Sequence, residues 1–139
     1  MDTNVVSELM RAEPSAAVAR WVGLQPAGEL ATTAVTVAEI GYGIERLPAG
    51  RRRELLRAAA AEVFDAFPEL VLPFDAAAAS SYAGVVVERD SAGLPISGFD
   101  AQIAAICRSK GALLATRNTA DFEALGLTLV NPWLDPAEG

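Results

Sequence analysis

The chain has 139 residues, a net charge of −7 and an apolar content of 52%, which together predict one ordered globular domain spanning residues 1–139. It contains no histidine, which excludes Ser-His-Asp and Cys-His catalysis and nearly all catalytic zinc sites. The acidic balance argues against binding nucleic acid by general charge attraction. Five arginines nevertheless gather in one stretch, at Arg46, Arg51, Arg52, Arg53 and Arg57.

The expected cellular location is the cytoplasm. A single cysteine, Cys107, allows no internal disulfide, and its place on an apolar helix face predicts a small buried side chain. No apolar run reaches membrane-spanning length. The first residues, Met1–Asn4, lack the charged start and apolar stretch of a signal peptide.

The first half of the chain is predicted to be mainly helical. Thr3 or Asn4 is expected to cap the first helix. Thr36 is expected to cap a later one, with Glu39 as its capping-box acid in the first turn. The expected elements are helices over 5–10 and 14–22, a strand over 30–33, a helix from 36 to 47, and a helix over 51–67 that Pro68 ends.

Strands and helices alternate in the second half. The expected elements are a strand over 70–74, a helix capped by Asp75 that runs through Val87, a loop over 89–93, a helix that opens within 95–107 and stops at Lys110-Gly111, a strand over 112–116, a short helix from Asn118, and a strand over 127–130. This alternation predicts a three-layer α/β/α sandwich around a mostly parallel sheet of four to five strands. Ligands of such sheets bind beyond the carboxyl ends of the strands.

Four acids are expected to meet at that edge: Asp2 before the first helix, and Glu39, Asp100 and Asp121 in first turns, with Ser97 capping the helix of Asp100. A helix dipole stabilises one such acid by about 0.3–1 kcal/mol, but gathered carboxylates raise each other's pKa and lower stability. A bound cation removes that cost. Carboxylate oxygens suit Mg²⁺ or Mn²⁺, which can activate water against a phosphodiester.

Four segments in order carry a resemblance: Asp2–Leu9, Thr36–Gly43, Phe99–Ala105 and Ala115–Phe122. They are similar to the motifs of PIN-domain ribonucleases, above all the VapC and FitB type toxins of bacterial toxin–antitoxin pairs, and Val130–Trp133 resembles the same group. The resemblance implies a PIN-like sandwich with Mg²⁺- or Mn²⁺-dependent endoribonuclease activity on RNA. It also implies a cognate VapB-like antitoxin, with the chain as a homodimer or in a heterotetramer or hetero-octamer with that partner.

The resemblance places the first three family acids on Asp2, Glu39 and Asp100. The fourth position stays open between Asn118 and Asp121. Asn118 offers only a neutral carbonyl, so Asp121 is the preferred acid. Thr116 is expected to orient a ligand or water. Arg117 is expected either to contact phosphate or to be an ordinary surface charge.

Family members have a short apolar strand before the first aspartate, where this chain offers only Met1. We therefore expect either a start a few residues upstream or a shortened central strand.

Tyr42 is expected to pack rather than stack on a base, and Gly41 and Gly43 to allow close helix packing. The arginine cluster is either a solvated helix start or a contact for RNA or an acidic antitoxin segment.

Two other functions are compatible with the sequence. One is a catalytically silent PIN-like module that only binds a protein partner. The other is a phosphatase or phosphotransfer domain with a nucleophilic aspartate. That chemistry needs a nearby lysine, and Lys110 falls at the far end of its helix from Asp100, which disfavours it.

Overall fold

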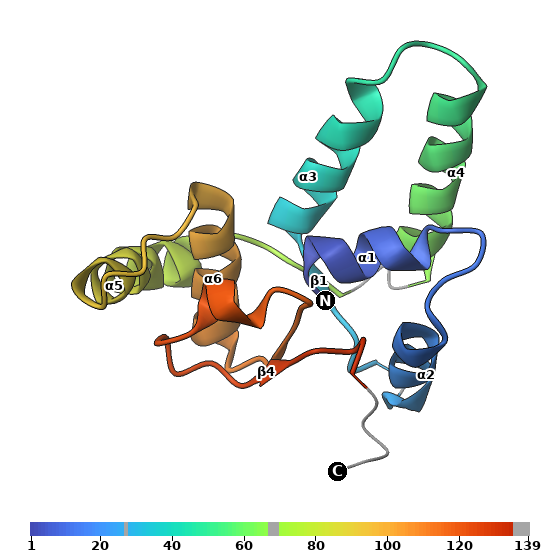
Figure 1. Ribbon diagram of the computed structural model, residues 1–139. Helices are drawn as coiled ribbons and strands as arrows, with labels where there is room; N and C mark the ends of the chain where they lie inside the picture. The colour runs from blue at the N-terminus through green and yellow to red at the C-terminus, as the bar shows by residue number, and fades with distance from the viewer. Residues whose placement is uncertain (27, 67–69, 135–139) are drawn as a thin grey trace.

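The computed structural model describes residues 1–26, 28–66 and 70–134, in which short strands lie between longer helices (Figure 1). Its elements are α1 (Thr3–Leu9), α2 (Ala16–Leu24), β1 (Thr32–Thr33), α3 (Ala34–Glu45), α4 (Arg51–Asp65), β2 (Val71–Leu72), α5 (Ala76–Ser91), α6 (Gly98–Lys110), β3 (Leu114–Ala115), the 3₁₀ helix η1 (Thr119–Phe122) and β4 (Leu129–Val130). Within those three ranges, none of the helices is both long and apolar enough to cross a lipid bilayer. The predicted α/β class is confirmed.

The strands are parallel as predicted, but they form two pairs rather than one sheet of four to five strands. β1 pairs with β2, and β3 pairs with β4. Met1 and Asp2 lie between the pairs. The Asp2 amide donates to the Ala115 carbonyl at 2.9 Å, and the Thr32 hydroxyl donates to the Met1 carbonyl at 3.1 Å. Such isolated bonds do not make a ladder, so the two pairs remain separate sheets.

Two apolar clusters flank the strands. The first joins α5, α6 and β3 and buries Val85, Ile103, Ile106, Leu114 and Phe122. The second joins α1, α2 and α3 and buries Val5, Val6, Val18, Ile40 and Ile44. In Figure 1, α5 and α6 lie on one side of the strands and α1 and α2 on the other, so the helices cover the strands from two sides. Burial of these apolar side chains is the main stabilising contribution to the fold.

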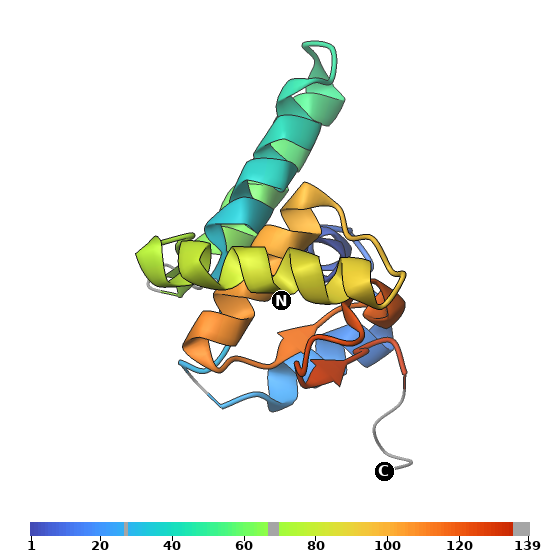
Figure 2. The ribbon, with the colours of Figure 1, turned by 90° about the vertical axis from the view of Figure 1, so that its left-hand side faces the viewer.

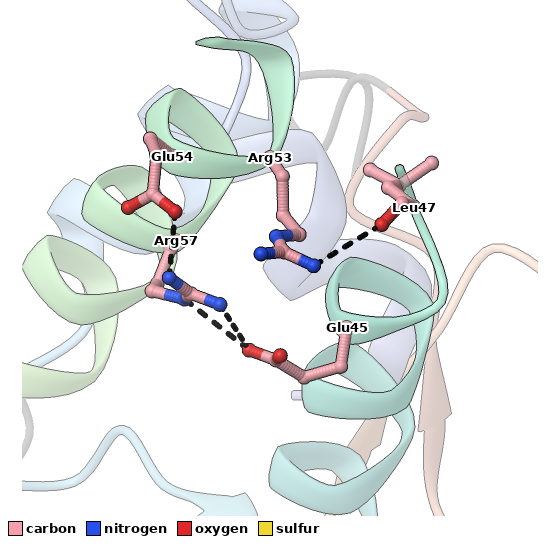
Figure 3. A network of polar contacts seen from close by, with 5 residues as sticks. All are labelled: Glu45, Leu47, Arg53, Glu54 and Arg57. Carbon is pink, nitrogen blue, oxygen red and sulfur yellow. Dashed lines mark hydrogen bonds and ion pairs between the residues drawn. The ribbon is translucent and has the colours of Figure 1, made fainter. Parts of the chain in front are cut away.

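Helices α3 and α4 run antiparallel and project from the body as a hairpin (Figures 1 and 2). Arg57 on α4 pairs with Glu45 on α3 at 2.8 Å and with Glu54 at 2.7 Å, and Arg53 donates to the Leu47 carbonyl (Figure 3). Two arginines of the predicted cluster therefore hold the hairpin together. The other members are exposed: Arg46, Arg51 and Arg52.

The predicted packing of the glycines and the tyrosine in α3 is wrong. The Tyr42 side chain is 72% exposed. A Cβ added at Gly41 or Gly43 would meet no described atom within 4 Å. A helix that projects from the body is covered on one side only, so these positions face open space.

The start of α1 differs from the prediction. Asp2, and not Thr3 or Asn4, is the N-cap, because its Oδ1 accepts a hydrogen bond from the Thr3 amide at 2.8 Å. One of the four acids predicted for the site is therefore also the N-cap of the first helix.

The start of α3 also differs. Thr33 is the N-cap, and its hydroxyl accepts from the Thr36 amide at 3.1 Å, so the predicted cap at Thr36 is wrong. The helix begins at Ala34, directly after β1. Glu39 consequently lies in the second turn of α3 and not in the first.

The predicted limits of α6 are confirmed. The Ser97 hydroxyl accepts from the Asp100 amide at 3.2 Å, and Gly111 ends the helix with a φ of +64°. Asp75 caps α5 as predicted, but this helix continues to Ser91, so the predicted loop at 89–93 starts later. For α4, the predicted end at Phe67 and Pro68 lies outside the described residues.

Two glycines give a matched test of these backbone conformations. Gly111→Ala forces a side chain into the left-handed region and should lower the free energy of unfolding by about 1 kcal/mol. Gly84→Ala, inside α5, meets only ordinary contacts at 3.7 Å and beyond and should raise it by about 1 kcal/mol. Urea denaturation measures both changes. Shifts of the midpoint in the same direction would contradict the assigned conformations.

Candidate active site

Three of the predicted acids line one cleft of about 460 Å³. Its wall also includes Arg117 and Asn118, which the sequence analysis named, and Ser7, Glu8 and Arg11, to which it gave no role. The lining residues are Asp2, Thr3, Asn4, Ser7, Glu8, Arg11, Glu39, Asp100, Arg117, Asn118 and Trp133. Thr116 lies buried behind Asp2, and Asp121 stands on η1 outside the lining.

Asp2 is 5% exposed and is held on both carboxylate oxygens. Oδ1 accepts from the Thr3 amide, and Oδ2 accepts from the Thr116 hydroxyl at 2.8 Å and from the Asn4 amide group at 3.3 Å. The Thr116 hydroxyl in turn accepts from the Asn118 amide at 3.1 Å. Thr116 therefore orients Asp2 and ties it to the segment that carries Asn118.

Glu39 is brought to the cleft by a contact between helices. The Thr3 hydroxyl on α1 donates to Glu39 Oε1 on α3 at 2.7 Å. Sequence reasoning missed this role of Thr3. The available signal was the position of Thr3 directly after Asp2, from which its hydroxyl can reach another acid of the same site.

The pKa of Asp100 depends on the charges of the other three acids. Burial, and then the negative charges of Asp2, Asp121 and Glu39, together raise the pKa of Asp100 to about 6, although the hydrogen bond with Ser97 acts in the opposite direction. The predicted gathering of like charges around Asp100 is therefore present. It includes Asp121, even though this residue does not line the cleft.

The donor set suits a hard divalent cation, because the carboxylates of Asp2, Glu39 and Asp100 line the same cleft. In the part of the chain that the structure describes, however, no three acidic side chains lie close enough to hold an ion in this conformation. Asp2 and Glu39 are each held by hydroxyl donors, as the ligands of metal sites commonly are.

Arg117 and Trp133 form the cationic part of the wall. The guanidinium carbon of Arg117 lies 5.1 Å from the centroid of the Trp133 ring, a cation–π distance. Asn4 Oδ1 accepts from the Arg117 backbone amide at 3.2 Å, and Asn131 Oδ1 accepts from the Trp133 backbone amide at 3.0 Å. The Trp133 ring therefore supports a positive charge beside the acids.

Glu8 is a buried acid that sequence reasoning did not single out. Its Oε2 accepts from the Ser15 amide at 2.8 Å, and its carboxylate pairs with Arg11 at 3.4 Å. These bonds join α1 to the start of α2. Glu8 lines the cleft, but its hydrogen bond and its ion pair give it a structural role at the junction of the two helices.

Comparison with known proteins identifies the family. The sequence model of the PIN domain matches residues 1–126. The chain belongs to the PIN-domain family. This PIN domain is similar to VapC ribonuclease Y4jK of Sinorhizobium fredii, with 43% identity over 99% of the chain and 98% of that protein. It is also similar to toxin FitB of Neisseria gonorrhoeae, with 32% identity over 97% of the chain and 98% of the toxin.

The fold comparison agrees. The crystal structure of FitAcB from Neisseria gonorrhoeae matches this PIN domain with a TM-score of 0.85 and 32% identity, covering 95% of the chain and 96% of the other. The predicted PIN-like fold is therefore confirmed.

The raised pKa of Asp100 gives a stability test in metal-free buffer. The folded chain keeps this proton up to about pH 6, whereas the unfolded chain loses it near 3.8. Between these values the folded state binds more protons, so the contribution of Asp100 to the free energy of unfolding falls as the pH rises.

Asp100→Asn should therefore raise Tm at neutral pH by about 3 °C and give no gain near pH 4. Thermal melts across this pH range measure the difference. A gain that does not depend on pH would contradict the electrostatic explanation.

Proposed function

We propose that this chain is an endoribonuclease toxin that hydrolyses RNA phosphodiester bonds with Mg²⁺ or Mn²⁺. The observation that carries the proposal is the cleft in which the charges of Asp2, Glu39 and Asp121 act on Asp100, with Arg117 at the rim. The similarity to a VapC ribonuclease and to toxin FitB supports the same activity. A toxic nuclease also requires a blocking partner in the cell that makes it, so we propose a cognate protein antitoxin.

In this proposal Asp2, Glu39 and Asp100 hold the ion, and Asp121 is the fourth acid in preference to Asn118. When bound, the cation supplies an activated water and stabilises charge on the phosphorus oxygens. Thr116 and Thr3 keep the carboxylates of Asp2 and Glu39 in place through their hydroxyl bonds. These bonds limit the motion of both carboxylates, so the two ligands stay oriented toward the ion.

Arg117 is the proposed phosphate contact. It is exposed, it lines the cleft, and its stacking on Trp133 limits where the guanidinium can point. A fixed cation beside a group of carboxylates favours the negatively charged backbone of RNA at this place on an otherwise acidic protein.

The two alternatives make different demands. A phosphatase with a nucleophilic aspartate needs a lysine at the site, but Lys110 pairs with Asp75 at 3.0 Å, at the opposite end of α6 from Asp100. A silent binding module needs no ion at all.

We expect the active chain to be a homodimer, or part of a heterotetramer or hetero-octamer with its antitoxin, and to act in the cytoplasm.

The first test combines cleavage with metal binding. Asp100→Asn should lower Mg²⁺-dependent cleavage of total RNA at least about 100-fold while the protein stays folded. Mn²⁺ at 100 times its Kd should stabilise the wild type by about 2.7 kcal/mol and the variant far less. Asp90→Asn, an exposed acid on α5, is the matched control and should behave as wild type. Undiminished cleavage by Asp100→Asn would overturn the proposal, and absence of any Mn²⁺ effect would favour the silent module.

The second test concerns Arg117. Arg117→Ala should weaken binding of single-stranded RNA in EDTA and reduce the slope of log K against log salt by about 0.7, the value for one lost phosphate contact. Fluorescence anisotropy at several salt concentrations measures both. Arg51→Ala removes an exposed arginine at the far end of the hairpin and should leave the slope unchanged. Equal effects of the two variants would indicate general charge attraction instead.

A further inference from the structure

Arg89, near the end of α5, is a charged side chain with only 4% exposure. A buried guanidinium is unfavourable unless its N–H groups are hydrogen-bonded. Arg89 Nη1 donates to the carbonyls of Ala120 at 3.1 Å and Glu123 at 2.9 Å. Its Nε is buried with no hydrogen-bond partner among the described residues. The partners of this charge are thus backbone oxygens of a distant segment.

That segment is the Asp121 loop, which we define as residues 118–125. Ala120 and Glu123 lie on either side of Asp121 and Phe122, so Arg89 holds both sides of the short 3₁₀ helix η1. Short 3₁₀ helices have poor internal hydrogen bonds and depend on outside contacts. The Phe122 ring, 1% exposed, anchors the loop in the apolar cluster that α5 and α6 form.

The same loop contains a strained residue and a second arginine. Ala124 has a φ of +67°, which a non-glycine residue adopts only when its surroundings hold it there. Arg108 on α6 donates to the Leu125 carbonyl at 2.6 Å and pairs with Glu88 on α5. Arginines from two helices therefore hold three carbonyls of a loop that has little regular structure of its own.

We propose that Arg89 is a positioning residue for Asp121: by holding the Ala120 and Glu123 carbonyls it keeps the fourth acid beside the other three. The metal-binding part of this role rests on the proposed function. Arg89 touches neither the cleft nor any group there, so its effect has to pass through the loop backbone. Asp121 itself is exposed, and its own side chain does not fix its position.

The first experiment does not depend on metal. Hydrogen exchange of the Asp121 loop should become faster in Arg89→Met, at the amides of Asp121 and Glu123, while α6 keeps its protection. Arg89→Lys, which keeps a donor, should restore part of the protection. Unchanged exchange in the loop would overturn the proposal whether or not the protein is a nuclease.

The second experiment is a double-mutant cycle on Mn²⁺ affinity, measured by calorimetry well below Tm. Arg89→Met alone should weaken Mn²⁺ binding about 10-fold, and in an Asp121→Asn background it should change binding less than twofold. A structural role alone predicts either no loss of affinity or the same loss in both backgrounds, and each of these results would overturn the proposal. Wild type that binds no Mn²⁺ and cleaves no RNA would instead overturn the proposed function.

Two further variants keep the cycle interpretable. If Arg89→Met is too unstable to study, Ala124→Gly is added to give a double variant. Glycine relieves the strain of the left-handed backbone at position 124, so the double variant should fold but still bind Mn²⁺ weakly. Arg108→Met removes the contact to Leu125, which is farther from Asp121, and should weaken Mn²⁺ binding less than Arg89→Met. Restored affinity in the chain with Ala124→Gly would show that stability, and not positioning, explains the effect.

Discussion

The contact between Asp2 and the end of β3 is the constraint on which the site depends. The Asp2 amide bonds to the Ala115 carbonyl, and its carboxylate bonds to the hydroxyl of Thr116, the next residue along. These two bonds set the position of α1 against the strands. Through Thr3 they also set where Glu39 meets the cleft. A single acidic residue therefore acts as helix cap, as the link between the strand pairs and as part of the cleft.

The cleft concentrates negative charge that the folded protein does not neutralise itself. The raised pKa of Asp100 is consistent with this, since burial and the charges of Asp2, Asp121 and Glu39 all favour the neutral form of its carboxyl group. A protein selected for stability alone would avoid such a group. Of the two arginines that line the cleft, Arg11 is paired with Glu8, and only Arg117 is left to face the acids.

Local features of the site were predictable, and features set by distant contacts were not. Ser97 and Asp100 form a cap within three residues, so the sequence alone located that helix start. In the segment that contains both Thr33 and Thr36, either threonine can serve as a cap. The first is favoured by the pairing of β1 with β2, which places Thr33 at the end of the strand. The burial of Arg89 depends on carbonyls more than thirty residues away, so the local sequence placed this arginine in a loop over 89–93.

The projecting hairpin has a consequence for how the molecule comes apart. Its helices share one covered face, its distal contacts are the exposed pairs of Arg57, and the connection at 46–50 is largely solvent-accessible. A protease would cut this connection first. The nicked molecule would then carry Asp2 and Glu39 on one fragment and Asp100 on the other. The cleft would persist as a complementation site between two chains, held together by the cores on either side of the strands.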